Sequence, residues 1–226
     1  MAPIRCQPNE PVGLLFESEE GTSNVTGPFH KAVANSAGRP VSPEEVVAYL
    51  YALVHSGEYR RRYQWELPID FPRIPVASSA ALTESLVTLG SELMDAHLLS
   101  EESLEGETEE PIGGKPFVVE KVTYDNRTIW LDRQKSKGFP GVPREVWDFK
   151  IGGYQVVEKW LKGRAAKGGK TPRPGRVLGE EDVLHIRRIV GAVSTTLRRQ
   201  ESIDQLIERH GGWPRAFEGR SSECAD

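Results

Sequence analysis

The residues of this chain best suited to chemistry are the lysines and arginines concentrated between positions 121 and 178. This interval holds 14 basic and 5 acidic side chains, hence a net charge of +9, whereas the 226-residue chain carries −4. Residues 1–120 hold 8 basic and 19 acidic side chains, hence −11. One interpretation is that the basic interval contacts a polyanion, and the other is that the two halves of the chain attract each other. The charges alone leave both interpretations open.

The sequence lacks the motifs of the common catalytic sites. It contains no GxxxxGK[ST] phosphate loop, no GxSxG nucleophile turn, no HExxH metal motif and no Asn-Pro-Pro-Tyr or Asp-Pro-Pro-Tyr motif of amino-methyltransferases. The five histidines are too scattered to suggest metal ligands. The adjacent carboxylates at 44–45 and 180–182 fall in predicted first turns of helices, where the helix dipole favours negative charge. We therefore expect no catalysis, no metal and no cofactor.

The composition favours a protein of the reducing cytoplasm. Cys6 and Cys224 lie near opposite ends of the chain and form no metal or redox motif. No run approaches eighteen apolar residues, and the N-terminus lacks the charged start and apolar block of a secretory signal. The length allows one ordinary core, or one core with a small satellite.

Helices must position much of the first half of the chain. A capping box at Ser42 and Glu45, with Pro43 at the first helical position, predicts a helix that ends near His55. A second helix is predicted over 56–67. It is followed by an extended strap, because each proline in DFPRIP disfavours helical geometry in the residue before it. Leucines at spacings of four, three and four residues then predict a helix over 80–98.

Strands are predicted where the basic interval begins. The β-branched and aromatic runs FVVEKVTY and RTIWL, joined by Asp125-Asn126, predict a β-hairpin. We expect it to form one small sheet with the segments near Phe139 and 149–151, interrupted by a short helical turn over 143–147. The fold class is thus α+β.

The second half of the chain also predicts helices. Apolar residues on one face predict a helix over 155–162, in which Glu158 and Lys162 form an i,i+4 pair. A Gly- and Pro-rich basic loop follows over 165–176. A long helix over 180–199 and a shorter one over 202–209 are expected at the C-terminal end. In the expected architecture, a helical N-terminal part packs on a small mixed β-region, and these two helices complete the fold.

Three segments of the sequence carry a family resemblance. They are LYALVHSGEYRRRYQWELPIDFPRIP (50–75), VEKVTYD (119–125) and GVPREVWDFKIGGYQVVEKWLKGR (141–164), followed by a helix that opens with LGEEDVLHIRRIV. Together they resemble the C-terminal specificity domain of type ISP restriction-modification enzymes of the LlaBIII-like group. The resemblance spans about residues 40–205. It implies a target-recognition module that reads duplex DNA for a neighbouring adenine methyltransferase, ATP-driven motor and nuclease, whose motifs this sequence lacks.

The sequence patterns and the resemblance together divide the chain into expected parts. These are a flexible segment (1–40), a specificity domain (41–210) with a helical part (41–100), a β- and recognition region (115–164) and C-terminal helices (179–210), and a tail (211–226).

A domain that reads DNA needs cations for phosphates and polar side chains for base edges. The basic interval offers both. The residues that we expect to contact DNA are Arg133, Lys135, Lys137, Arg144, Lys150, Gln155, Lys159, Lys162, Arg164, Lys167 and Lys170. Two other functions stay open: a protein-interaction module that docks on a methyltransferase or helicase without binding DNA, and an unrecognised nuclease or hydrolase, against which the absent motifs argue.

Several residues of this region have a structural interpretation as well. The aromatic residues at 147, 149, 154 and 160, together with Ile151, fit a core better than a base-stacking surface. Gly152-Gly153 fits a tight strand-to-helix turn, although close approach of a phosphate to its backbone is the alternative. Lys159 and Lys162 fit the solvated face of a helix as well as a DNA contact.

Overall fold

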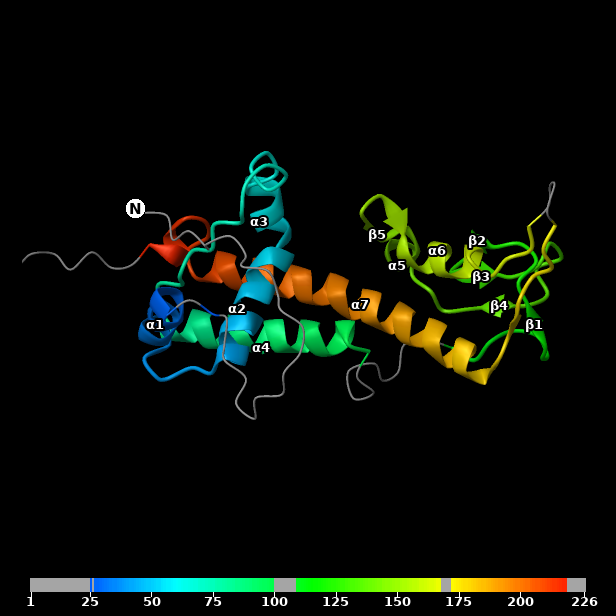
Figure 1. Cartoon of the computed structure of the whole chain (residues 1–226), viewed down its shortest axis with the longest axis horizontal. Helices are drawn as coiled ribbons and strands as arrows, with labels where there is room; N and C mark the ends of the chain where they lie inside the picture. Colours follow the sequence, from blue (N-terminus) through cyan, green and yellow to red (C-terminus); the bar gives the residue numbers. More distant parts are fainter. Residues whose placement is uncertain (1–24, 26, 100–108, 168–171, 219–226) are drawn as a thin grey trace, which may run out of the picture. The chain divides into compact units, whose positions relative to one another are not determined.

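The fold is α+β and divides into two compact units (Figure 1). The computed structural model describes residues 25, 27–99, 109–167 and 172–218. Unit 1 comprises residues 1–94 and 198–226, and unit 2 comprises residues 95–197. Lys170, one of the predicted DNA contacts, lies outside the described residues.

Unit 1 is helical. Its elements are α1 (Gly27–Ala37), α2 (Pro43–His55), α3 (Gly57–Arg62), most of α4 (Ala80–His97), the end of α7 (Glu180–Arg209) and the 3-10 turn η2 (Arg215–Phe217). The predicted capping box opens α2: the Glu45 amide donates to Ser42 Oγ at 3.2 Å, and the Ser42 amide donates to Glu45 Oε2 at 2.7 Å. The helices predicted over 43–55 and 80–98 are therefore confirmed to within a residue.

The core of unit 1 forms where α2 and α4 meet. Tyr49 and Leu53 of α2 and Leu86 of α4 are fully buried, and they share the core with residues of α1 and the end of α7. The two helices approach closely at Gly90, where a Cβ would lie 1.8 Å from the carbonyl oxygen of Ala48. Any larger residue at Gly90 would force α2 and α4 apart.

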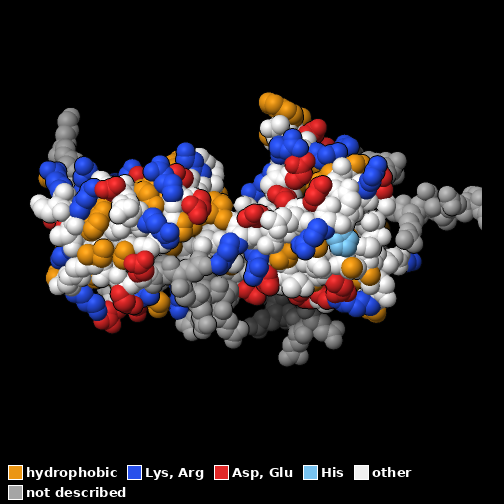
Figure 2. Space-filling view, turned by 180° about the vertical axis from the view of Figure 1, so that it is seen from behind, with side chains coloured by type: hydrophobic (Ala, Val, Ile, Leu, Met, Phe, Trp, Pro, Cys, Tyr) orange, Lys and Arg blue, Asp and Glu red, His pale blue; other side chains and the backbone are white. Residues whose placement is uncertain are grey.

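The segment 63–75 projects from unit 1 after α3. Its base is fixed, because Tyr59 Oη donates to the carbonyl of Arg73 at 2.9 Å and Tyr49 Oη donates to that of Pro75 at 2.8 Å. Burial raises the pKa of Tyr59 to about 12, which keeps this donor protonated. The segment leaves Trp65, Ile69 and Phe71 exposed by 78%, 85% and 67%. In Figure 2 it forms the hydrophobic tip at the top of the molecule.

Unit 2 is built on very short antiparallel strands. They are β1 (Phe117–Val118) paired with β7 (Val177–Leu178), β2 (Thr123–Asp125) with β3 (Thr128–Trp130) and β4 (Gly138–Phe139), and β5 (Lys150–Ile151) with β6 (Tyr154–Gln155). Helices α5 (Arg144–Asp148) and α6 (Val156–Lys162) and the first part of α7 complete the unit. The predicted hairpin is confirmed for β2 and β3, but its turn lies one residue later than predicted. The turn residues are Asn126 and Arg127, which both have positive φ, as a type I′ turn requires.

A shared core holds the elements of unit 2 together. Ile129 of β3, Val157 and Leu161 of α6, and Ile186 of α7 are fully buried in it. Beside this core the rings of Tyr124 and Trp147 stack with centroids 5.1 Å apart and planes 8° apart. Each strand is only two or three residues long, so the helices supply much of the buried apolar surface.

Three predictions about the ends and helices of the chain are wrong. Residues 27–37 form α1 with Phe29 and Val33 buried, so the segment 1–40 is not flexible throughout. The expected tail begins with η2, which buries Phe217. The two helices expected over 180–199 and 202–209 are one, because the residues between them are all compatible with a helix and none is Gly or Pro.

Two further predictions fail at segment boundaries. The helix predicted over 56–67 ends at Arg62, and hydrogen-bonded turns follow, such as the Leu67 amide donating to the Tyr63 carbonyl. The run FVVEKVTY does not form a single strand, because its first residues pair with β7 rather than with β3. Residues 150–151 likewise pair with β6 in a separate ribbon. No helix in the described ranges is long and apolar enough to cross a membrane.

We predict that Ile186→Ala destabilises the protein by about 2–5 kcal/mol, because it leaves a cavity in the core of unit 2. Urea unfolding followed by circular dichroism measures the loss. The matched control is Leu184→Ala, two residues earlier on α7, whose side chain is 48% exposed against 0% for Ile186. The control should change stability by about 0.5 kcal/mol or less. Equal losses from the two variants would contradict the described packing of α7.

Candidate nucleic-acid interface

The candidate DNA-contact residues that the structure describes all lie in unit 2, in three places. Arg133, Lys135 and Lys137 follow β3. Arg144 opens α5. The others lie on or after the β5–β6 hairpin: Lys150, Gln155, Lys159, Lys162, Arg164 and Lys167.

Several of these cations are already paired with carboxylates. Arg144 Nε lies 2.5 Å from Asp148 Oδ2, and Lys135 Nζ lies 2.5 Å from Asp125 Oδ2. The predicted i,i+4 pair of α6 is confirmed, with Lys162 Nζ 2.9 Å from Glu158 Oε1. The hydrogen bond from Lys135 lowers the pKa of Asp125, so this carboxylate is ionised at neutral pH. Lys137 Nζ instead donates to the carbonyl of Pro116 at 2.6 Å.

Arg164 is held most tightly among the candidates. Its guanidinium lies 3.5 Å from the centroid of the Trp160 ring and donates to the Trp160 carbonyl at 3.2 Å. Its Nε lies 3.5 Å from Oδ1 of Asp182, a largely buried carboxylate that also pairs with Arg176 at 3.3 Å. These contacts fix the end of α6 to the first turn of α7, which gives Arg164 a structural role.

The Gly-Gly pair forms the turn of a β-hairpin rather than a strand-to-helix turn. Gly152 and Gly153 have φ of 55° and 83°, and they join β5 to β6 as a two-residue loop. No atom lies within 4 Å of where a Cβ would stand on either glycine. The hairpin tip is therefore open to solvent.

Two side chains of this hairpin are exposed, against prediction. Ile151 is 65% exposed and Tyr154 59%, whereas both were expected in the core. The reason is their strand pairing, because residues 150–151 join an isolated ribbon instead of the three-stranded sheet that the core covers. Trp147 is buried as expected, while Phe149 and Trp160 are partly buried against the core.

Gln155 and Lys159 are positioned by contacts around the hairpin. The Gln155 side-chain amide donates to the Trp147 carbonyl at 3.0 Å and to Asp148 Oδ1 at 3.3 Å, and so anchors the ribbon to α5. Lys159 Nζ lies 3.5 Å from the centroid of the Tyr154 ring. A ring quadrupole holds this ammonium without neutralising its charge.

A second group of cations makes no hydrogen bond or ion pair through its side chains with any described residue. It contains the exposed residues Arg133, Lys150 and Lys167, and also Lys121, which was not among the predicted contacts. Lys121 was not predicted because the residues next to it in the sequence do not indicate whether its side chain is paired.

Lys121 and Arg133 line one groove of about 440 Å³, together with Lys135 and Tyr124. The acidic residues of the groove are occupied, since Asp125 pairs with Lys135 and Asp132 accepts hydrogen bonds from Ser136. The Arg144 guanidinium lies 5.6 Å from the centroid of the Tyr124 ring. Three cations thus line the groove, and two of them, Lys121 and Arg133, have no carboxylate partner among the described residues.

Asp132 organises the loop that carries Arg133, Lys135 and Lys137. Its carboxylate accepts the Ser136 amide at 2.9 Å and the Ser136 hydroxyl at 2.5 Å. Burial opposes its ionisation, but the hydrogen bonds from Ser136 and Lys137 outweigh burial and hold the pKa of Asp132 below its usual value. The loop is therefore closed around the Asp132 carboxylate, and Arg133 beside it is exposed.

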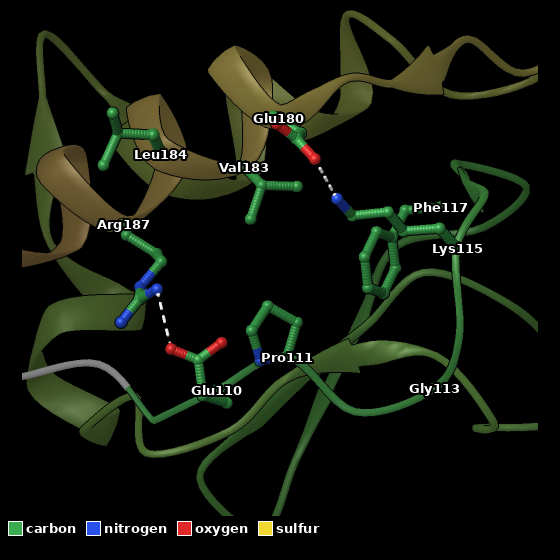
Figure 3. Close-up of a pocket in the computed structure, with 9 residues that line it drawn as sticks. All are labelled: Glu110, Pro111, Gly113, Lys115, Phe117, Glu180, Val183, Leu184 and Arg187. Carbon is green, nitrogen blue, oxygen red and sulfur yellow. Dashed lines mark hydrogen bonds and ion pairs between the residues drawn. The ribbon is translucent and has the colours of Figure 1, made fainter.

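A second pocket, of about 340 Å³, lies between the loop 110–117 and the start of α7 (Figure 3). Lys115 pairs with Glu180, and Arg187 Nη1 lies 3.1 Å from Glu110 Oε1. The two ion pairs fasten the loop to the helix on either side of the pocket. Because its charges pair with one another, this pocket suits an anion less well than the groove beside Tyr124. The described residues include no group of three or more His, Cys, Asp or Glu placed to hold a metal ion.

Solved structures with a similar fold include two type ISP restriction-modification enzymes. A nuclease-deletion mutant of the type ISP restriction-modification enzyme LlaGI, in complex with a DNA substrate mimic, matches 74% of this chain with a TM-score of 0.52 and 19% identity. The ATP-dependent type ISP enzyme LlaBIII bound to DNA matches 82% with a TM-score of 0.57 and 20% identity. A DrdV–DNA complex matches 76% with a TM-score of 0.57 and 19% identity.

The fold is thus one found within type ISP restriction-modification enzymes. The type ISP C-terminal specificity domain family matches residues 2–174, and the chain belongs to this family. It covers only 14%, 13% and 19% of the three chains above. No curated protein matches it.

We predict that Asp132→Asn destabilises the protein by about 1–3 kcal/mol at pH 7, because the amide cannot replace a charged acceptor of three donors. A carboxyl with a lowered folded pKa stabilises the fold above its ordinary pKa of 3.8, and that contribution is lost as the pH falls below this value. The difference between wild type and variant should therefore shrink in acid. Urea unfolding between pH 7 and pH 3 measures it.

The control for this experiment is Glu120→Gln, which changes an exposed carboxylate of the same unit. It should keep the stability and the pH profile of the wild type. An Asp132→Asn protein with wild-type stability at pH 7 would contradict the role given to Asp132.

Proposed function

We propose that this chain is the DNA sequence-recognition domain of a type ISP-like restriction-modification system. It binds duplex DNA in the cytoplasm for an associated adenine methyltransferase, motor and nuclease, and it catalyses no reaction itself. The observation that carries the proposal is a set of exposed, unpaired cations in unit 2 of a chain that belongs to the specificity-domain family. The DNA complexes of the similar enzymes support it.

The unpaired cations are the best candidates for phosphate contacts. Arg133, Lys150 and Lys167 can approach a phosphate without leaving a carboxylate. Arg144 and Lys162 would first have to leave Asp148 and Glu158. An exposed ion pair contributes only about 0–1 kcal/mol, so this exchange is possible, but it reduces the net gain from the contact.

The groove beside Tyr124 adds a site of suitable shape and charge. Lys121 and Arg133 stand on its rim with no carboxylate partner among the described residues. With Lys150 and Lys167 they make about four phosphate contacts. Each contact releases counterions, so the logarithm of the affinity should fall with the logarithm of the salt concentration at a slope of about −4.

A second candidate function is favoured by the projecting segment 63–75 of unit 1. Its exposed Trp65, Ile69 and Phe71 have the residue types of protein-binding hot spots. In this alternative the chain docks on a methyltransferase or helicase polypeptide and does not bind DNA. In that case wild type would capture a type ISP polypeptide that lacks its own specificity domain, and Trp65→Ser/Ile69→Ser/Phe71→Ser would abolish this capture. Wild type itself would not bind DNA.

We predict that the variant Arg133→Ala/Lys150→Ala/Lys167→Ala binds duplex DNA more weakly and with a salt slope smaller by about 3. Fluorescence anisotropy with a labelled duplex at several salt concentrations measures both quantities. The matched comparison is Arg144→Ala/Lys162→Ala, which removes two cations that are paired with carboxylates. For each cation removed, this variant should reduce the salt slope by less than the triple variant does.

Two results would contradict the proposal. One is wild-type binding that does not depend on salt. The other is wild-type affinity weaker than about 10⁻⁴ M, since even non-specific DNA-binding proteins usually bind more tightly.

A further inference from the structure

We infer that the β5–β6 hairpin enters the major groove of the target duplex and that Ile151 and Tyr154 contact base edges there. This inference rests on the proposed function and assigns its sequence-reading element. It is carried by the pairing, exposure and anchoring of the hairpin rather than by its charge alone.

The pairing of the hairpin sorts its side chains onto two faces. Ile151 lies opposite Tyr154, and Lys150 lies opposite Gln155, and residues directly opposite each other project from the same face of a ribbon. The Gln155 amide donates to the Trp147 carbonyl, so its face is turned toward α5. Ile151 and Tyr154 therefore occupy the other face, which α5 does not cover.

The exposed pair is not part of either core. Ile151 and Tyr154 belong to neither of the two buried clusters. Single exposed apolar residues are common on protein surfaces, but here two stand side by side next to the tip of a ribbon. An isoleucine and a tyrosine can contact the thymine methyl group and the polar base edges of the major groove.

The cations beside this pair suit the phosphates that border a groove. Lys150 precedes Ile151 on β5, on the face of the ribbon that it shares with Gln155, and makes no side-chain hydrogen bond or ion pair with a described residue. Lys159 Nζ stands over the Tyr154 ring, and no carboxylate is among its described partners. A contact pair with one available cation over Tyr154 and another at the adjacent position of the strand complements DNA better than an apolar protein surface, which would desolvate these charges.

The shape of the hairpin also fits a groove. A two-stranded ribbon has strands about 4.8 Å apart, and the major groove, about 12 Å wide, admits such a ribbon. The glycine tip adds no side chains, and nothing lies within 4 Å of its Cβ positions. The base of the ribbon is rigid, since the Val156 amide donates to the Phe149 carbonyl at 3.1 Å beside the Gln155 anchor.

The test begins with the wild-type full chain and a randomised duplex library, from which the preferred sequence is selected. Anisotropy titrations then compare the preferred duplex with a scrambled one for wild type and for Ile151→Ser/Tyr154→Ser. We expect the variant to lose about 10-fold or more of the preference, because a good base contact discriminates to that extent. Its salt slope and its affinity for the scrambled duplex should stay near wild type.

Two further variants separate base reading from other effects. Val177→Ser removes an exposed apolar residue from another short strand of unit 2 and should keep the full preference. Lys150→Ala/Lys159→Ala should weaken binding to both duplexes equally and reduce the salt slope by about 1 for each of the two cations that contacts a phosphate. Thermal unfolding by circular dichroism checks that every variant is folded.

The outcomes distinguish this inference from the proposed function. A wild-type chain that binds no duplex overturns both. A wild-type chain that binds duplex DNA without sequence preference, or an Ile151→Ser/Tyr154→Ser variant that keeps the preference, overturns the base-reading role of the hairpin and leaves the proposed function standing.

Discussion

Unit 2 depends on the apolar residues that the first part of α7 contributes to its core. Strands of two or three residues cannot hold a sheet together in water, because an isolated two-stranded hairpin is marginal at best. Ile186, Val190 and Val193 fill the space beside β3 and α6, and the Arg164–Asp182 ion pair fixes the end of α6 to the start of the same helix. The core formed by α7, α6 and β3 therefore stays packed without the loops and hairpins that project from it.

This arrangement separates two kinds of cation. Those near the frame, such as Arg164 and Arg176, share the carboxylate of Asp182 and connect elements. Those on projecting parts, such as Lys150 and Arg133, have no carboxylate partner among the described residues. The number of basic residues in the sequence is therefore larger than the number of cations available to a ligand. The available cations are identified only from the contacts of each side chain in the structure.

The sequence predicts local features well and non-local ones poorly. The capping box of α2, the ion pair of α6 and the leucine stripe of α4 need only residues a few positions apart, and they were predicted correctly. Ile151 and Tyr154 were misplaced because a strand looks the same in sequence whether or not another element covers it. The unpaired state of Lys121 depended likewise on residues far along the chain.

The open tip of the β5–β6 hairpin has an evolutionary consequence. Its exposed residues contribute to neither core, and its anchor lies behind them at Gln155. Substitutions at Lys150, Ile151 and Tyr154 can therefore accumulate with little effect on folding, since surface changes away from such anchors usually alter stability by about 0.5 kcal/mol or less. A lineage carrying this fold can diversify at the hairpin while selection on the core keeps the scaffold constant.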